Sequence, residues 1–305
     1  MPEAVPRVQI VPQTDDAVSF QVDGAERGRW NAAKRHPRPH LFPVLAPSGR
    51  SITRMGHPAD SSHDHHRSVW FAHRDVAGVN FWEDRPDARQ QIRQERWLAY
   101  QDGDEEALAA VRLGWFDAHN VRLMQQDLLI AFRPLPGGET EWEFQSAFTT
   151  GLDPLVLGKT NFGFLAVRVA KTLSARYGGG RLRSSTGVVG EPGIFAKPAA
   201  WMDYSGPTTR DGWEGVTYFD HPGNPRQPTS WHVRDDGWMS AAFCLNEGYK
   251  LAKGVPLTLR YLLHVHAGDV DPKAADARLK AFADRPPFQA VTGVKHYPFV
   301  FERRP

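Results

Sequence analysis

The most constraining feature of this 305-residue chain is a two-residue period of apolar side chains, broken throughout by glycine and proline. In residues 141–148 aromatic and polar residues alternate, so one face of a strand would be buried and the other wetted. Similar runs lie at 18–22, 68–72, 108–116, 121–132, 164–170, 215–219, 239–245 and 257–265. Many strands joined by short turns predict an all-β fold, a large antiparallel β-sandwich, rather than alternating strands and helices.

One helix is expected, close to the C-terminus. Residues 272–283 carry apolar residues at helical spacing, with Asp271 as the N-cap and a proline at the first helical position. We expect this helix to cover an edge or an end of a sheet. Because the composition does not shift along the chain, the sequence favours a single domain over residues 1–305.

The charges and the hydropathy pattern exclude several classes of partner. The chain has 37 lysines and arginines against 35 aspartates and glutamates, scattered along its length. The sequence therefore shows no basic cluster of the kind that binds a nucleic acid. No run approaches the roughly 20 apolar residues of a membrane span, and the first residues lack the pattern of a signal peptide. We therefore predict a cytoplasmic protein with a small-molecule ligand and no membrane partner. Cys244, the single cysteine, is expected to be a buried structural thiol.

Residues 57–73 contain five of the 13 histidines. Imidazole titrates near neutrality, transfers protons and binds transition metals as the neutral base, whereas a core built for stability would use aliphatic residues. Trp70, Phe71, Phe81 and Trp82 would anchor this segment against a core. The segment is therefore a candidate active or binding site, and the alternative is a solvated surface loop.

Two His-x-His pairs suggest a metal chelate, because alternate residues of an extended segment share a face. The pairs are His63 with His65, and His264 with His266. If both pairs met, three or four imidazoles could hold zinc, manganese or iron, with Glu83 or Asp203 as a carboxylate ligand. In the other interpretation the histidines act as acids, bases and hydrogen-bond donors without a metal.

A third group mixes aromatic rings with polar side chains, in residues 201–206, 220–225 and 229–232. A pyranose has an apolar face that stacks on an aromatic ring and a rim of hydroxyls that need polar partners. For each tryptophan alone we favour a place in the core. For His221 and Asn224 we favour function, because the flanking prolines fix the direction of these side chains.

These segments together resemble one bacterial family, labelled methane oxygenase PmoA. The resemblance covers about residues 35–266 and rests on Pro39–Pro43, Asp64–His73, Asn80–Trp82, Trp201–Gly206, His221–Pro225 and Trp231–His232. Family members have a shorter Asp-His-Pro-His-His approach where this chain has Asp60–His66. The resemblance implies a supersandwich similar to galactose mutarotase and a companion sugar oxidoreductase in carbohydrate catabolism. It does not imply a methane-oxidising subunit, which would need a membrane span.

We therefore predict a carbohydrate-active enzyme that acts on a sugar, keto-sugar or glycoside by general acid-base chemistry, as an epimerase, lyase or hydrolase. No cofactor is expected in this interpretation. The alternatives are a metal-dependent lyase or oxygenase and a non-catalytic sugar-binding module. The predicted catalytic residues are His65, His66, Asp203, His221 and His232. The predicted substrate-binding residues are Arg54, Arg67, His73, Trp82, Asn224, Trp231 and Arg260. The metal ligands of the alternative are His63, His65, His264 and His266.

Overall fold

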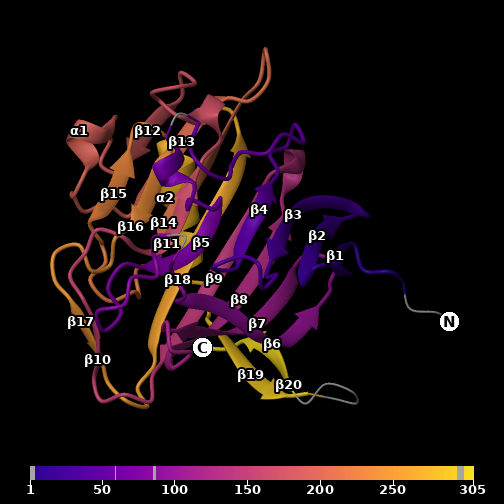
Figure 1. The fold of residues 1–305 in the computed structure, drawn as a ribbon. Coiled ribbons are helices and arrows are strands. Elements are labelled where there is room, and N and C mark those ends of the chain that lie inside the picture. The colour runs from indigo at the N-terminus through magenta and orange to yellow at the C-terminus, as the bar shows by residue number, and fades with distance from the viewer. Residues whose placement is uncertain (1–3, 59, 85–86, 294–298) are drawn as a thin grey trace.

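The computed structural model describes residues 4–58, 60–84, 87–293 and 299–305. Two eight-stranded antiparallel sheets pack face to face (Figure 1). The strand order of the first sheet is β1 (Val8–Gln13), β2 (Ala17–Val22), β3 (Ala25–Asn31), β4 (His40–Val44), β5 (Val69–His73), β11 (Gly163–Arg168), β16 (Trp238–Ala241) and β15 (Trp231–Arg234). The strand order of the second sheet is β12 (Arg181–Ser184), β13 (Trp201–Pro207), β14 (Trp213–Asp220), β18 (Leu257–Ala267), β9 (Thr140–Thr149), β8 (Arg122–Pro134), β7 (Ala107–Phe116) and β6 (Gln91–Gln101). The predicted antiparallel β-sandwich is confirmed.

Smaller elements complete the chain. Two two-stranded sheets are formed by β10 (Leu155–Leu157) with β17 (Tyr249–Leu251), which are distant in the chain, and by β19 (Phe288–Thr292) with β20 (Phe299–Arg303). The helices are α1 (Glu191–Ile194) and α2 (Pro272–Ala283), and the 3₁₀ turns are η1 (Ser61–His63), η2 (Pro136–Gly138) and η3 (Lys171–Leu173).

The main core lies between the inner faces of the two sheets. In β9, Trp142 and Phe144 point inward, and the Trp142 ring lies 5.1 Å from that of Phe20 in β2. Phe71 of β5 reaches the same layer, with its ring centroid 6.4 Å from that of Phe144. Burying each such aromatic side chain contributes about 1.5–3 kcal/mol, so the alternation seen in the sequence is the main driving force for this sandwich.

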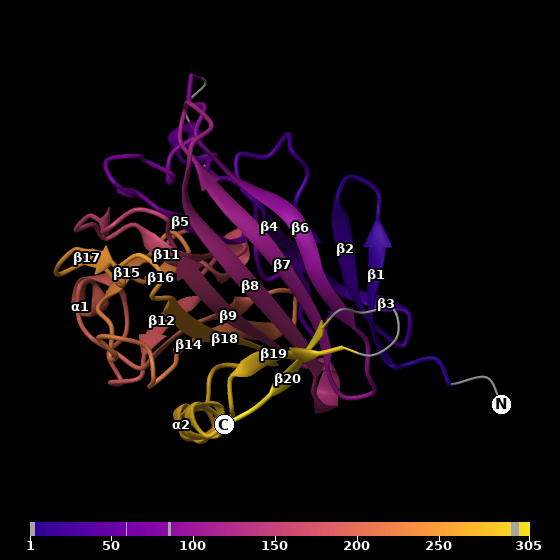
Figure 2. The same ribbon diagram turned by 90° about the horizontal axis from the view of Figure 1, so that it is seen from below.

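The outer face of the second sheet is covered by α2 and the β19–β20 hairpin, the yellow elements of Figure 2. As predicted, α2 spans Pro272–Ala283, and the Asp271 side chain accepts a hydrogen bond of 3.0 Å from Lys273 N. Phe282 of α2 packs in a small cluster with Leu262 of β18. Beside this cluster, Glu143 accepts hydrogen bonds from Arg260, Arg285 and Arg303 at 2.7–2.9 Å. The polar residues on this face therefore form hydrogen bonds and ion pairs that hold the C-terminal elements against the sheet.

The outer face of the first sheet carries a separate aromatic cluster on its later strands. Antiparallel pairing sets Ala166 of β11 opposite Trp70 of β5 and Ser240 of β16, so the outward side chains of these strands lie side by side. The cluster consists of Trp70, Ala72, Trp82, Ala166 and Trp238, with Phe162 packed against it. This face positions the site described below.

Two local predictions from the sequence are wrong. The segment with His63 and His65 is not extended, because the Asp60 carboxylate accepts hydrogen bonds from Ser62 N (2.9 Å) and Ser62 Oγ (2.6 Å) and holds the 3₁₀ turn η1. Strand β16 ends at Ala241 instead of continuing to residue 245. Within the described part of the chain, no helix has the length and apolar character needed to cross a membrane.

Candidate functional site

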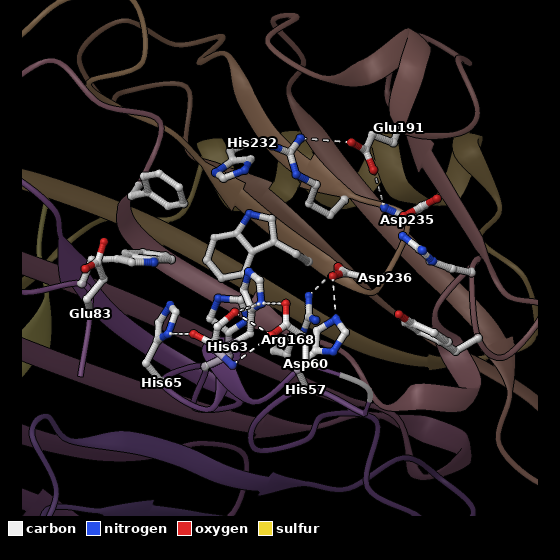
Figure 3. A pocket seen from close by; sticks show the side chains of 18 of the residues that line it. His57, Asp60, His63, His65, Glu83, Arg168, Glu191, His232, Asp235 and Asp236 are labelled. Carbon is white, nitrogen blue, oxygen red and sulfur yellow. Dashed lines mark hydrogen bonds and ion pairs between the residues drawn. The ribbon is translucent and has the colours of Figure 1, made fainter. Parts of the chain in front are cut away.

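A pocket of about 1180 Å³ opens on the outer face of the first sheet (Figure 3). Its floor comes from β11, β15 and β16, and its rims come from the loops that precede β5 and follow it, from the segment after η3, and from α1. The lining residues are His57, Asp60, Ser62, His63, His65, His66, Trp82, Glu83, Asp84, Phe162, Arg168, Arg176, Tyr177, Glu191, Pro192, His232, Arg234, Asp235, Asp236 and Trp238. Most of these side chains are aromatic, imidazole or charged.

Aromatic rings form a platform in the pocket. The ring centroids of Trp82 and Trp238 are 5.0 Å apart, and that of Phe162 is 5.1 Å from Trp82. Trp238 reaches the pocket because the alternation of β16 directs it away from the core, whereas Met239 points inward. The two tryptophan planes cross at 82° and each side chain is 2 % exposed, so the half-buried Phe162 offers the more accessible aromatic surface for the C–H face of a sugar.

Two imidazoles in the pocket share the same arrangement of hydrogen bonds. His232 Nδ1 lies 2.9 Å from the backbone oxygen of Asn161, and His65 Nδ1 lies 3.0 Å from that of Ser62. A carbonyl oxygen only accepts, so each Nδ1 carries the proton and each Nε2 keeps its lone pair. The two rings pack at the edges of the tryptophan platform, His232 at 5.5 Å from Trp238 and His65 at 6.3 Å from Trp82.

Both of these imidazoles are neutral at physiological pH. Burial, together with the charge of Arg234, lowers the pKa of His232 to about 3. Burial, together with the charge of Arg38, lowers the pKa of His65 to about 4. Each ring therefore has an unprotonated Nε2 that can accept a proton or a hydrogen bond, and the Nε2 of His232 lies 3.5 Å from the amide donor Asn161 Nδ2.

His66 lies deeper in the pocket and is 6 % exposed. Its ring stacks on Trp238 with centroids 5.1 Å apart. Burial, followed by the nearby charge of Arg168, lowers the pKa of His66 far below its usual range. Within the described residues its Nδ1 has no hydrogen-bond partner, so His66 is held by packing and not by a hydrogen bond to that atom.

Asp236 anchors one end of the pocket. Its carboxylate accepts hydrogen bonds from Arg168 Nη1 at 2.6 Å and from His57 Nε2 at 2.9 Å (Figure 3). Burial opposes ionisation of this carboxyl, but the hydrogen bond and charge of Arg168 outweigh it, and the pKa of Asp236 is lowered. Asp236 lies in the turn between β15 and β16, where Gly237 adopts φ 103°, a value that other residues rarely adopt.

The charged side chains of the lining are mostly acidic. The carboxylates are Asp60, Glu83, Asp84, Glu191, Asp235 and Asp236, and the guanidinium groups are Arg168, Arg176 and Arg234. Several are paired: Arg234 with Glu191 at 3.0 Å, Asp60 with His63 at 2.7 Å, and Asp84 with Arg67 at 2.9 Å. Carboxylates that face a pocket serve as acceptors for hydroxyl groups of a ligand.

The structure brings part of the predicted site together here. His63, His65, His66, Trp82 and His232 line the pocket. Two further predicted residues lie directly behind the lining: Arg54 donates to the backbone oxygen of Asp236 at 3.2 Å, and Arg67 donates to the Asp84 carboxylate.

Other predicted residues lie on the outer face of the second sheet, on the far side of the sandwich. Asp203 accepts a hydrogen bond from His266 Nε2 at 2.9 Å, and His264 Nε2 lies 2.8 Å from Glu139. The structure therefore does not bring the two His-x-His pairs together. In the described ranges, no group of three or more His, Cys, Asp or Glu side chains has an arrangement that would hold a metal ion.

The remaining predicted residues have partners within the fold. Near α2, Arg260 Nη1 donates to His221 Nε2 at 3.0 Å, and Arg260 N donates to Asn224 Oδ1 at 2.8 Å. His73 Nε2 donates to the Gly158 oxygen at 3.2 Å, and Trp231 Nε1 donates to the Ala199 oxygen at 2.8 Å inside the main core. None of these five predicted side chains, Arg260, His221, Asn224, His73 and Trp231, lines the pocket.

Sequence reasoning missed several pocket residues, notably Arg168, Asp236 and the functional position of Trp238. Arg168 has a visible signal, because it is a charged residue within the apolar run of β11. The Arg234–Gly237 turn likewise places three charged residues next to a predicted site histidine.

One protein family, described as a family of unknown function, has a profile that matches residues 17–280. The chain belongs to this family, DUF6807. The matched region includes every residue that lines the pocket, so the pocket lies wholly within the DUF6807 region. A search of curated proteins gives no match to the chain.

Proposed function

We propose that this DUF6807 protein is a carbohydrate-active enzyme that moves protons on a sugar, keto-sugar or glycoside. The observation that carries the proposal is the pair of imidazoles, His65 and His232, which Nδ1 hydrogen bonds to backbone oxygens hold at the edges of the Trp82–Trp238 platform. A sugar ring lying in the pocket beside these aromatic rings would have an unprotonated Nε2 on either side. General acid-base catalysis requires groups held in this way.

The lining suits a sugar in two further respects. Its aromatic rings match the apolar face of a pyranose, and its carboxylates match the hydroxyl rim. The volume of about 1180 Å³ is ample for a sugar with a substituent.

The proposed first step is transfer of a proton from a carbon next to a carbonyl to the Nε2 of His232 or His65. The electron pair of the broken C–H bond forms a C=C bond while the carbonyl π electrons move onto the oxygen, and a nearby arginine such as Arg234 would stabilise the charge of this enolate. Protonation of the opposite face by a second proton donor, with the first proton released to water, gives an epimer, whereas loss of a neighbouring leaving group gives an eliminated product. Both outcomes use the same base.

The resemblance to the PmoA family supports this choice of substrate. A companion sugar oxidoreductase would supply the ketone that makes the neighbouring C–H bond acidic. The antiparallel sandwich is compatible with the supersandwich that the resemblance implies, although a fold alone does not define an activity.

The proposal is tested by measuring turnover of aldoses, keto-sugars and glycosides by NMR with His232→Gln, His65→Gln and a control, His119→Ala. His119 is an exposed histidine of the β7–β8 turn. We expect the two pocket variants to lose about 10²- to 10⁴-fold in turnover while remaining folded, and the control to keep it. Unchanged turnover in both pocket variants would refute the assignment. Binding of a sugar that the wild-type protein leaves unchanged would instead indicate a binding module.

A further inference from the structure

A second hollow adjoins the pocket beyond Phe162 and Glu83. It has a volume of about 330 Å³ and is lined by Arg74, Asp75, Gly78, Asn80, Lys159 and Thr160. The Arg74 guanidinium lies 5.3 Å from the centre of the Phe162 ring and 3.7 Å from the Glu83 carboxylate, both of which line the main pocket. The two cavities are therefore neighbours across a shared wall.

Hydrogen bonds hold the residues of this wall in fixed positions. The side chain of Asn80 accepts from Trp82 N at 2.9 Å, and Thr160 Oγ1 accepts from Phe162 N at 3.2 Å. Each bond joins a residue of the hollow to an aromatic residue of the platform. A ligand that bridges the cavities would thus meet a fixed spacing between them.

The charged groups of the two cavities differ in how they are paired. In the main pocket, Asp84, Glu191 and Asp236 are ion-paired with arginines, and Asp60 is paired with His63. The hollow has two cations, Arg74 and Lys159, against Asp75, whose Oδ1 already accepts a hydrogen bond of 2.8 Å from Gly78 N. Lys159 is exposed and forms no ion pair with any residue that the structure describes.

We propose that the ligand is an acidic saccharide of at least two linked units, with an uncharged unit in the main pocket and an anionic unit in the hollow. This inference rests on the proposed function and specifies its substrate class. The anionic group is an oxyanion on the sugar, either a carboxylate or a sulfate. Arg74 would bind it with its planar fork of donors and Lys159 with its ammonium group. Lys159, which forms no ion pair with a described residue, would hold the anionic unit in the hollow and so set the direction of the saccharide.

The test is binding to an array of neutral, uronate-bearing and sulfated oligosaccharides, by the wild-type protein, Lys159→Glu and the control Lys273→Glu. Lys273 is an exposed lysine of α2, on the far side of the sandwich. For the best-bound acidic oligosaccharide and its neutral counterpart, calorimetry then gives the two affinities. We expect at least a tenfold preference for the acidic member, lost in Lys159→Glu, kept in the control and weakened by salt.

The outcomes separate this inference from the proposed function. Equal binding of neutral and acidic oligosaccharides, or an unchanged preference in Lys159→Glu, would overturn the acidic subsite and leave the proposed function standing. Binding of monosaccharides alone would overturn the two-unit substrate. No saccharide binding at all would overturn both proposals. Comparison of the uronate and sulfate members identifies which anion the hollow accepts.

Discussion

Replacement of Asp236 by alanine should destabilise the protein strongly, because it removes the ion-pair partner of a fully buried arginine. Arg168 is 0 % exposed, and its Nη1 donates to Asp236 at 2.6 Å. Its Nε and Nη2 have no partners among the described residues, so no second carboxylate would take over. Breaking a buried pair from one side costs about 3–5 kcal/mol. At about 2 °C per kcal/mol for a chain of this size, the melting temperature should fall by about 6–10 °C.

The assay is thermal and urea unfolding of Asp236→Ala beside Asp235→Ala. Asp235 lines the same pocket but is held through its backbone, with Glu191 accepting from Asp235 N and Asp235 O accepting from Arg176 N. The control should therefore change stability by only about 0.5 kcal/mol. Equal melting temperatures for the two variants would refute the view that the Arg168–Asp236 pair holds the end of the pocket.

Further predictions concern pH and the single thiol. Turnover should show no acid limb between pH 8 and 5.5, because the pKa of His65 is lowered to about 4 and that of His232 to about 3; a loss centred near pH 6.5 in a pH–rate profile would contradict this. The free energy of unfolding, measured in urea, should fall below pH 6.5. His73 and His232 bind protons at these pH values only when the chain is unfolded, because burial lowers their pKa in the folded protein. The loss should be about 1 kcal/mol per histidine between pH 6.5 and 5.5. Equal free energies of unfolding at pH 6.5 and pH 5.5 would contradict the view that these buried histidines are neutral in the folded protein. Burial raises the pKa of Cys244 to about 12, so the native protein should not react with a thiol reagent at pH 8 until it is unfolded; fast labelling of the folded protein would contradict its burial.

The sandwich and α2 could be predicted from the sequence because both depend on local patterns. Residues 141–148 alternate in the strand period, and Asp271 with Pro272 marks a helix start, whatever the rest of the chain does. The boundary of β16 was less predictable, because the apolar run continues past Ala241 into a turn.

The composition of the pocket depends on strand pairing between distant segments. Arg168 and Trp238 meet because β11 pairs with β16, a contact between residues 70 positions apart in the chain. Because local sequence patterns do not specify strand pairing, the predicted residues fall on two different sheets. Histidines on β15 and β18 have similar local patterns, yet His232 faces the pocket and His266 binds Asp203 on the other sheet.

The central claim is that the pocket transfers protons on a sugar, and deuterium exchange tests it most directly. The wild-type protein would be incubated in D₂O with a panel of keto-glycosides, and the C–H signals next to the ketone followed by proton NMR. We predict their loss, or the appearance of an eliminated product, at a rate that falls at least about 100-fold in His232→Gln. A keto-glycoside that binds in the pocket yet keeps every C–H signal would contradict the account.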